Sequence, residues 1–269
     1  RFRSAMPSNM PTRPLIIANF KMNPASQAAS RALIREIARG IRGLRGIEVV
    51  VAPPFPYLAL AASLLPRGAV AAQDVFWEDR GPYTGAVSPL MLRDLGVSAV
   101  IIGHSERRRV FAESDDIVNR KVKAALRAGL TPSVAVGEEL HESQEVVPPA
   151  IASQLSRALA GIPRAHCTRV AIAYEPVWAI STTAGAAADT PDNATRRAIY
   201  IRKLLTKLAG SRAAQAMRIL YGGSVNAKNA ASFLARDIRG MEGLLVGGAS
   251  LRAGEFVALV RAVAAHWRG

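Results

Sequence analysis

Eight short apolar runs, separated by turns and amphipathic stretches, constrain the fold of this 269-residue chain more than any other feature of its sequence. Almost all residues in each run are apolar, so both faces of each predicted strand are apolar. Such strands are typical of parallel sheets covered by helices on both faces, whereas half-exposed antiparallel strands alternate between apolar and polar residues. The predicted strands are residues 15–19, 48–52, 69–73, 99–103, 133–137, 170–174, 217–221 and 244–247.

Helix signals lie between the runs. Ser88, Ser114 and Thr190 each offer a capping hydroxyl, and Pro follows directly after the first and the last of them. Residues 26–44 carry apolar side chains at helical spacing, as an outer amphipathic helix does. Eight βα units in about 250 residues are the number and size of a closed barrel, so the sequence predicts an α/β fold of the (β/α)8 type, with eight parallel strands and outer helices. An open doubly wound sheet is the alternative.

The chain divides into one large unit and a short basic segment. No low-complexity linker interrupts residues 14–269, which we expect to form one barrel domain. Residues 1–13 contain arginine, no acid and no apolar core of a signal peptide, so we expect a flexible tail. Cys167, the single cysteine, cannot form an intrachain disulfide, which favours a reducing, cytoplasmic location. No apolar run approaches the roughly 20 residues of a membrane span, so no membrane partner is expected.

The charge balance is strongly basic. The chain has 35 Lys and Arg against 20 Asp and Glu, a formal net charge of +15, which favours a negatively charged substrate or partner. A nucleic-acid-binding protein on a barrel scaffold is therefore the competing functional class. The arginines are scattered over predicted helices without aromatic platforms, as on a solvated surface, so we expect no nucleic-acid partner.

Polar residues with chemical potential follow three of the apolar runs. Asn19 and Lys21 follow the first, His104 and Glu106 the fourth, and Glu175 the sixth. Each has a structural interpretation too: a solvated lysine, a hydrogen-bonded core histidine, a salt-bridged acid. Chemistry in a (β/α)8 barrel lies at the carboxyl ends of the strands, however, and a carboxylate buried there is costly unless it is paired or acts as a base.

Glycine pairs follow the last two runs. Gly222-Gly223-Ser224 comes after the seventh and Gly247-Gly248 after the eighth. Glycines allow backbone N–H groups to approach a dianion closely, and barrels often bind phosphate in the loops after these two strands. Simple tight turns are the alternative, but two such turns beside a lysine, a histidine and a glutamate favour a phosphate site.

At these segments the sequence resembles the triosephosphate isomerase family. The matching segments cover nearly the whole chain in order, and the most specific are ANFKMN (18–23), IIGHSERR (101–108), AYEPVWAI (173–180), YGGSV (221–225) and LVGGASL (245–251). The resemblance implies an intramolecular isomerase that interconverts dihydroxyacetone phosphate and D-glyceraldehyde 3-phosphate.

The resemblance also implies roles for the strand-end residues. Glu175 looks like the base that moves a proton between adjacent carbons, and His104 like the neutral electrophile at the substrate oxygens, a pairing taken from the family rather than worked out from spacing. Lys21 looks like the cation for the phosphate and the enediolate, and Asn19 like a donor to the substrate oxygen. Glu106 is similar to the family's second acid, within reach of Lys21.

The phosphate is expected on backbone N–H groups. The resemblance places these at Ser181, Ser224, Gly247 and Gly248. It implies no metal and no organic cofactor, because the proton moves within one substrate.

The chain departs most from the family in the loop after the sixth run. Residues 181–190 are about three residues longer than usual and lack two hinge-side glycines. A longer loop keeps open an alternative substrate, a four-carbon ketose phosphate of the erythrulose phosphate type. The loop around Thr84 inserts into a second subunit in the family, so a homodimer is implied. Glu242 replaces the usual aspartate and is expected to pair with Arg202 near the sixth-strand loop.

Overall fold

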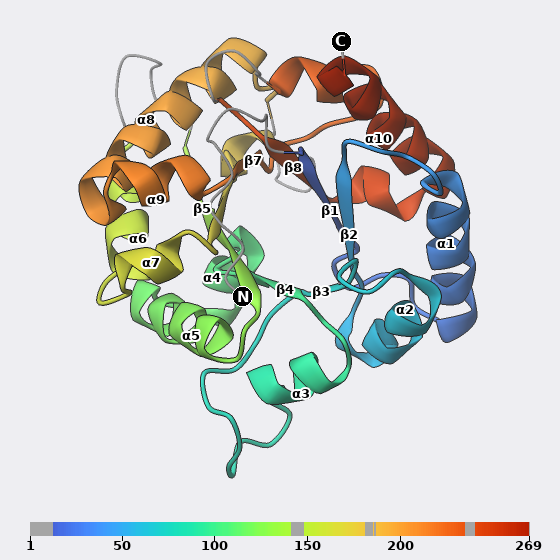
Figure 1. Cartoon of the computed structure of the whole chain (residues 1–269), viewed down its shortest axis with the longest axis horizontal. Coiled ribbons are helices and arrows are strands. Elements are labelled where there is room, and N and C mark those ends of the chain that lie inside the picture. The colour runs from blue at the N-terminus through green and yellow to red at the C-terminus, as the bar shows by residue number, and fades with distance from the viewer. Residues whose placement is uncertain (1–12, 141–147, 181–184, 186, 235–239, 269) are drawn as a thin grey trace, which may run out of the picture.

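A ring of parallel strands surrounded by helices forms the molecule (Figure 1), and the computed structural model describes residues 13–140, 148–180, 185, 187–234 and 240–268. The strands are β1 (Leu15–Asn19), β2 (Glu48–Ala52), β3 (Ala71–Ala72), β4 (Ala99–Ile102), β5 (Thr131–Val136), β6 (Ala171–Tyr174), β7 (Ile219–Tyr221) and β8 (Gly243–Val246). The tail predicted at residues 1–13 lies outside the described residues except for Arg13.

Strand pairing decides between the two predicted architectures. The hydrogen-bonded order is β2-β1-β8-β7-β6-β5-β4-β3, and every neighbouring pair is parallel. A parallel bridge between Val51 and Val70 joins the two ends of this order. The sheet thus closes on itself, which confirms the (β/α)8 barrel and excludes the open doubly wound sheet.

β3 is shorter than the run that predicted it. Residues 69–73 were expected as a strand, yet only Ala71–Ala72 pair in regular fashion. Gln73 reaches β2 and the turn after β1 through its side chain instead: its Nε2 donates to the carbonyl oxygens of Ala52 and Lys21, both at 2.8 Å. A side-chain amide therefore replaces the backbone ladder there, and the chain leaves the barrel for the long excursion before α3 (Figure 1).

Helices cover the outside of the ring (Figure 1). They are α1 (Gln27–Gly40), α2 (Leu58–Leu64), α3 (Pro89–Asp94), α4 (Ser105–Phe111), α5 (Asp115–Arg127), α6 (Pro149–Ala158), α7 (Arg164–Cys167), α8 (Pro191–Ala209), α9 (Ser211–Ala216) and α10 (Ala253–Arg268), with 3-10 turns η1 (Phe55–Tyr57), η2 (Val177–Ala179), η3 (Ala230–Phe233) and η4 (Gly248–Leu251). The predicted caps are confirmed, because Ser88, Ser114 and Thr190 each accept a hydrogen bond from the backbone N–H three residues later.

Two apolar cores hold these layers together. Inside the ring, Ile17, Ile101 and Leu245 belong to a cluster of inward-facing strand residues. A larger cluster lies between the ring and the helices, where α1 buries Leu33 and Ile37. The two-faced apolar pattern of the runs is explained by this double burial.

No helix among the described residues has both the length and the apolar character needed to cross a membrane.

One predicted ion pair forms, but at the other end of the barrel from the expected place. Arg202 Nη2 lies 2.7 Å from Glu242 Oε2. Glu242 precedes β8, and Arg202 also donates to the carbonyl oxygens of Ala214 and Met217 just before β7. The expected position near the sixth-strand loop is therefore wrong, because Glu242 lies at the amino end of its strand and the loop follows a carboxyl end.

Candidate active site

The strand-end residues line one cavity at the carboxyl ends of the strands. It measures about 460 Å³, and we call it the strand-end cavity. β1 contributes Asn19 and Lys21, the end of β4 contributes His104, and the end of β6 contributes Glu175. The glycine turns after β7 and β8 complete its wall. Residues from five strands thus meet because all eight strands run in the same direction.

Glu175 is the buried acid of this cavity. Its side chain is 3 % exposed, its Oε2 accepts a hydrogen bond from the Ser105 backbone N–H at 3.0 Å, and its Oε1 lies 3.2 Å from His104 Nε2. Within the described ranges it makes no ion pair with lysine or arginine. The carboxylate is therefore held by neutral donors, which leaves it able to take up a proton.

Two glycines allow this carboxylate to sit where it does. A Cβ atom at Gly137 would lie 1.8 Å from the Glu175 carbonyl oxygen, and one at Gly222 would lie 2.8 Å from Glu175 Cγ. Sequence reasoning assigned Gly222 to phosphate binding and missed its packing against Glu175. Gly137 is expected from the sequence at the end of the fifth strand, and a glycine at that point is the sequence signal of close packing.

His104 is held in one tautomer by the main chain. It caps α4, and its Nδ1 accepts a hydrogen bond from the Glu106 backbone N–H at 3.2 Å. An acceptor nitrogen carries no proton, so the ring hydrogen resides on Nε2, which faces Glu175. Protonating Nδ1 would break the bond to the main chain. The arrangement favours the neutral imidazole with Nε2 as a donor.

Lys21, which lines the strand-end cavity, forms an ion pair with Glu106. Lys21 Nζ lies 2.6 Å from Glu106 Oε1. Burial raises the pKa of Glu106, but the hydrogen bond from Lys21 and the nearby charges of Lys21 and Arg109 outweigh burial, so this pKa lies below its usual value. The Lys21 backbone has φ 50°, a left-handed conformation, and its N–H donates to Asn19 Oδ1 at 3.0 Å. Asn19 thus holds the turn that carries the lysine.

The predicted phosphate donors are placed less uniformly. Gly247 and Gly248 start the η4 turn, and a Cβ atom at Gly247 would lie 3.4 Å from Lys21 Cε, so this turn borders the lysine. The Ser224 N–H and Oγ both donate to the Ala179 carbonyl oxygen, at 3.3 and 2.9 Å. Ser224 therefore links the β7 turn to η2 in this arrangement. Ser181 lies outside the described residues.

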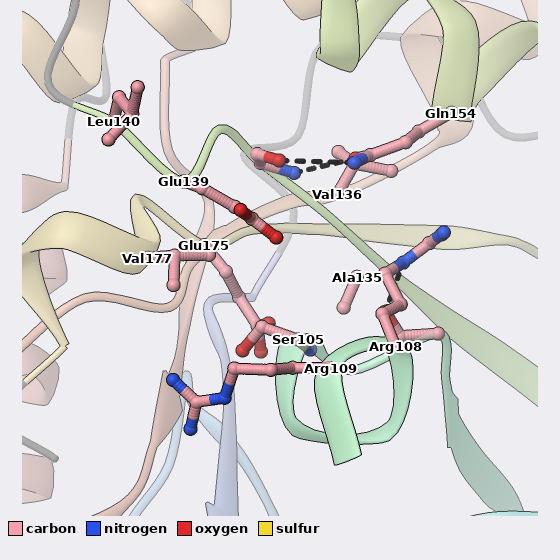
Figure 2. Close-up of a pocket in the computed structure, with 12 residues that line it drawn as sticks. Ser105, Arg108, Arg109, Ala135, Val136, Glu139, Leu140, Gln154, Glu175 and Val177 are labelled. Atoms are coloured by element: carbon pink, nitrogen blue, oxygen red, sulfur yellow. Dashed lines mark hydrogen bonds between the residues drawn. The ribbon is translucent and has the colours of Figure 1, made fainter. Parts of the chain in front are cut away.

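A second cavity lies beside Glu175, away from the glycine turns (Figure 2). It measures about 760 Å³, and Arg109 and Glu139 border it. Gln154 extends from α6 to the Gly137 peptide, accepting from its N–H at 2.8 Å and donating to its carbonyl at 3.1 Å. Because Gly137 packs against the Glu175 backbone, Gln154 supports the position of the acid indirectly, a contact that sequence reasoning missed.

No metal cluster is evident in the part of the chain that the structure describes: no three His, Cys, Asp or Glu side chains there are grouped to hold an ion. The polar side chains that line the strand-end cavity are instead those of Glu175, His104, Lys21, Asn19 and Ser224, which supply one acid, one neutral imidazole, one ammonium, one amide and one hydroxyl. Such a set can move a proton beside a carbonyl and stabilise the negative oxygen that results.

Comparison with known proteins agrees with this chemistry. A sequence model of the family described as Triosephosphate isomerase matches residues 14–263. The chain is 45% identical over 253 residues to a protein named triosephosphate isomerase from Citrifermentans bemidjiense, covering 93% of this chain and 98% of that protein. Similar proteins of the same name occur in Geotalea uraniireducens, at 44% identity over 253 residues, and Carboxydothermus hydrogenoformans, at 41% over 252, again covering 93% of this chain and 98% of each relative. With this coverage and identity, the chain belongs to the triosephosphate isomerase family.

Proposed function

We propose that the chain interconverts dihydroxyacetone phosphate and D-glyceraldehyde 3-phosphate by proton transfer through an enediol(ate). The observation that carries the proposal is the contact between a buried Glu175 carboxylate and Nε2 of a His104 held neutral by the main chain. A base and a neutral acid side by side are what the transfer of one proton between adjacent carbons requires. Family membership supports the same activity.

Each residue then has a defined step. Glu175 removes a proton from the carbon next to the carbonyl, forming its own carboxylic acid and leaving the electron pair in the enediolate. His104 Nε2–H donates to the substrate oxygen and takes the proton of the neighbouring oxygen in return. Glu175 finally delivers its proton to the adjacent carbon, so the enzyme ends in its initial state.

Lys21 and Asn19 stabilise the charge that develops. The Lys21 ammonium borders both the β8 turn and the strand-end cavity, so one cation serves the phosphate and the enediolate oxygen. Glu106 holds Lys21 by their ion pair. Gly247 and Gly248 offer backbone N–H groups to the phosphate, with Ser181 as a further donor of the proposal. Ser224 serves as another donor once it releases the Ala179 carbonyl oxygen.

The test is Glu175→Asp, assayed with triose phosphate and with erythrulose phosphate side by side. Shortening the side chain by one methylene retracts the carboxylate, and a displacement of about 1 Å costs roughly a hundredfold in rate. We expect kcat to fall by that factor with little change in KM. Activity within threefold of the unmodified enzyme would remove Glu175 from the role of base, and a wild-type preference for the tetrulose would overturn the triose substrate.

We also infer a homodimer formed through the loop around Thr84. Residues 81–85 are exposed and belong to the excursion that projects beyond α3 (Figure 1). Tyr83 is 43 % exposed in this loop and lies against Phe76, with 4.7 Å between ring centroids, so an aromatic surface is available for a second subunit. Analytical ultracentrifugation of Thr84→Arg should give a monomer; an unchanged dimer would place the interface elsewhere.

A cytoplasmic location completes the proposal. The free and buried Cys167 supports a reducing compartment. Cell fractionation with an antibody against the chain tests it, and recovery in the membrane or secreted fraction would overturn it.

A further inference from the structure

A large groove opens at the end of the barrel opposite to the strand-end cavity. It measures about 1460 Å³, and its border is formed by the ends of α1 and α2, by Arg13 just before β1, and by the first residues of β2. α1 and α2 are neighbours in the ring of helices (Figure 1). These segments lie at the amino ends of the strands, so we call the feature the amino-end groove. The proposed reaction at Glu175 makes no use of it.

The floor of the amino-end groove is apolar. Its side chains are half-buried, because they pack against the main core on one side and border the groove on the other. They are Ile41, Leu44, Ile47, Val49 and Leu64. An open apolar surface with a charged rim is typical of an interaction site. The core of the barrel therefore continues into a surface on which further apolar side chains can pack.

The rim of the groove is positively charged. Arg13, Arg42 and Arg67 line it, all three are exposed, and none of them makes an ion pair within the described ranges. Glu48, the one acid among the described lining residues, is already paired, because its Oε2 lies 2.6 Å from Arg218 Nη1. The rim thus keeps an excess of positive charge, which favours an anionic partner.

The composition of the lining distinguishes between anionic partners. Single-stranded nucleic acids bind through aromatic side chains that stack on the bases, and no aromatic residue is found among the described residues of the groove. A lipid surface binds apolar side chains that project from the protein, whereas these form a recessed floor between two helices. An acidic polypeptide with apolar side chains of its own matches both the floor and the rim.

Two occupants made of this chain are disfavoured by charge. Residues 1–12, which precede Arg13, contain two arginines and no acid. A second copy that docked through the same groove in a two-fold dimer would place the arginines of one rim against those of the other. Like charges oppose both arrangements, so the segment that fits the groove belongs to a different protein.

We propose that the amino-end groove binds an acidic, amphipathic segment of another protein. Such a segment lays its apolar side chains on the floor and directs its carboxylates to Arg13, Arg42 and Arg67. A helix with apolar residues at positions i, i+3, i+4 and i+7 and acids between them has this character. Because the groove lies at the far end of the barrel from Glu175, the inference is independent of the proposed function.

The test measures binding of a synthetic helical peptide of about 15 residues, with leucine at helical spacing and glutamate elsewhere, by fluorescence anisotropy in about 0.15 M salt. An exposed charge pair corresponds to up to about fivefold in affinity, and reversal of the charge replaces attraction by repulsion. Arg42→Glu and Arg67→Glu should therefore each weaken binding by roughly five- to twentyfold. Arg35→Glu is the matched control, because Arg35 is exposed on α1 but lies outside the groove; it should change the affinity by less than about twofold.

The apolar contact is tested on the peptide, so that the fold of the protein is not at risk. Replacing the leucines by serine keeps the charge and removes the apolar face, and it should weaken binding by more than about tenfold. Equal affinity for the two peptides would overturn the proposal, as would equal affinity for a single-stranded oligonucleotide of the same charge, because a general attraction between anions and a basic protein would then account for binding.

The location is tested by the protein variants. Arg42→Glu and Arg67→Glu replace exposed side chains, so both should keep the thermal midpoint and the isomerase activity of the unmodified chain while they lose affinity for the peptide. Affinities equal to that of Arg35→Glu would place the peptide elsewhere and refute the groove as its site. Tighter binding to phosphatidylserine vesicles than to the peptide, with the same dependence on the rim arginines, would replace the acidic segment by a lipid surface.

Discussion

Gly222→Ala should displace Glu175, the proposed catalytic base, without removing a single polar group. The added Cβ would lie 2.8 Å from Glu175 Cγ and 3.0 Å from the Tyr174 carbonyl oxygen. The carbonyl oxygen belongs to β6 and accepts the Gly222 N–H at 2.7 Å, so it cannot withdraw. The Glu175 backbone is equally fixed, because its N–H donates to the Val136 carbonyl at 2.8 Å. The side chain of Glu175 is therefore what must move.

The size of the displacement follows from the contact distance. Ordinary van der Waals contact starts at 3.4 Å, so the difference 3.4 − 2.8 gives a shift of about 0.6 Å at Cγ. Since misplacement by about 1 Å costs roughly a hundredfold, a shift of this size corresponds to about ten- to thirtyfold in kcat. In free energy of activation this is about 1.4–2 kcal/mol. KM should change little, because the glycine turn keeps its N–H groups.

A coupled assay of glyceraldehyde 3-phosphate isomerisation measures this effect, with thermal unfolding recorded in parallel. Gly254→Ala is the control, because a Cβ at this exposed position of α10 meets nothing within 4 Å. Its kcat should equal that of the unmodified enzyme. A Gly222→Ala enzyme with kcat within threefold of wild type and an unchanged thermal midpoint would refute the reasoning.

Three further predictions concern stability. The folded-state pKa of Glu106 lies below its ordinary value of 4.5, so its pair with Lys21 stabilises the fold above about pH 4.5, and this stabilisation is lost as the pH falls through the lower pKa. The difference in thermal midpoint between wild type and Glu106→Gln should therefore shrink on acidification. A difference that grew would contradict this. Lys121 Nζ contacts the buried carboxylates of Asp74 and Glu113, so Lys121→Met should lower the free energy of unfolding, measured in urea, by about 3–5 kcal/mol. Arg157→Met removes only an exposed ion pair and should lower it by less than about 1 kcal/mol. Equal losses would contradict the argument that burial makes the Lys121 contacts more costly to remove. Ala112 ends α4 with φ 53°, a left-handed conformation that glycine adopts without strain, so Ala112→Gly should relieve about 1 kcal/mol and raise the thermal midpoint by a few degrees. A lower midpoint would show that the alanine is not strained there.

Local pattern was sufficient to predict the barrel and much of the cavity. The apolar runs and the Ser and Thr caps act within a few residues, and parallel strands bring their carboxyl ends together, so Lys21, His104 and Glu175 could be expected in one place. The length of β3 could not be predicted, because the Gln73 side chain replaces backbone pairing through contacts with Lys21 and Ala52, which are far from it in the sequence.

The parts of the site that sequence reasoning missed all depend on three-dimensional contact. Gln154 reaches the Gly137 peptide from another element, and Ser224 binds the Ala179 carbonyl. The position of Glu242 was wrong for a related reason: its pairing with Arg202 was expected correctly, but the end of the strand at which it lies was not.

The contact between His104 Nδ1 and the Glu106 N–H has a consequence for mutational robustness. Every residue except proline carries this N–H, so the hydrogen bond survives 18 of the 19 possible replacements of the Glu106 side chain as far as the donor is concerned. The side chain at position 106 can thus change while His104 Nδ1 keeps its backbone donor and the ring proton stays on Nε2. The hydrogen bond that fixes the His104 tautomer therefore depends on the main chain at position 106 and hardly on which side chain that position carries.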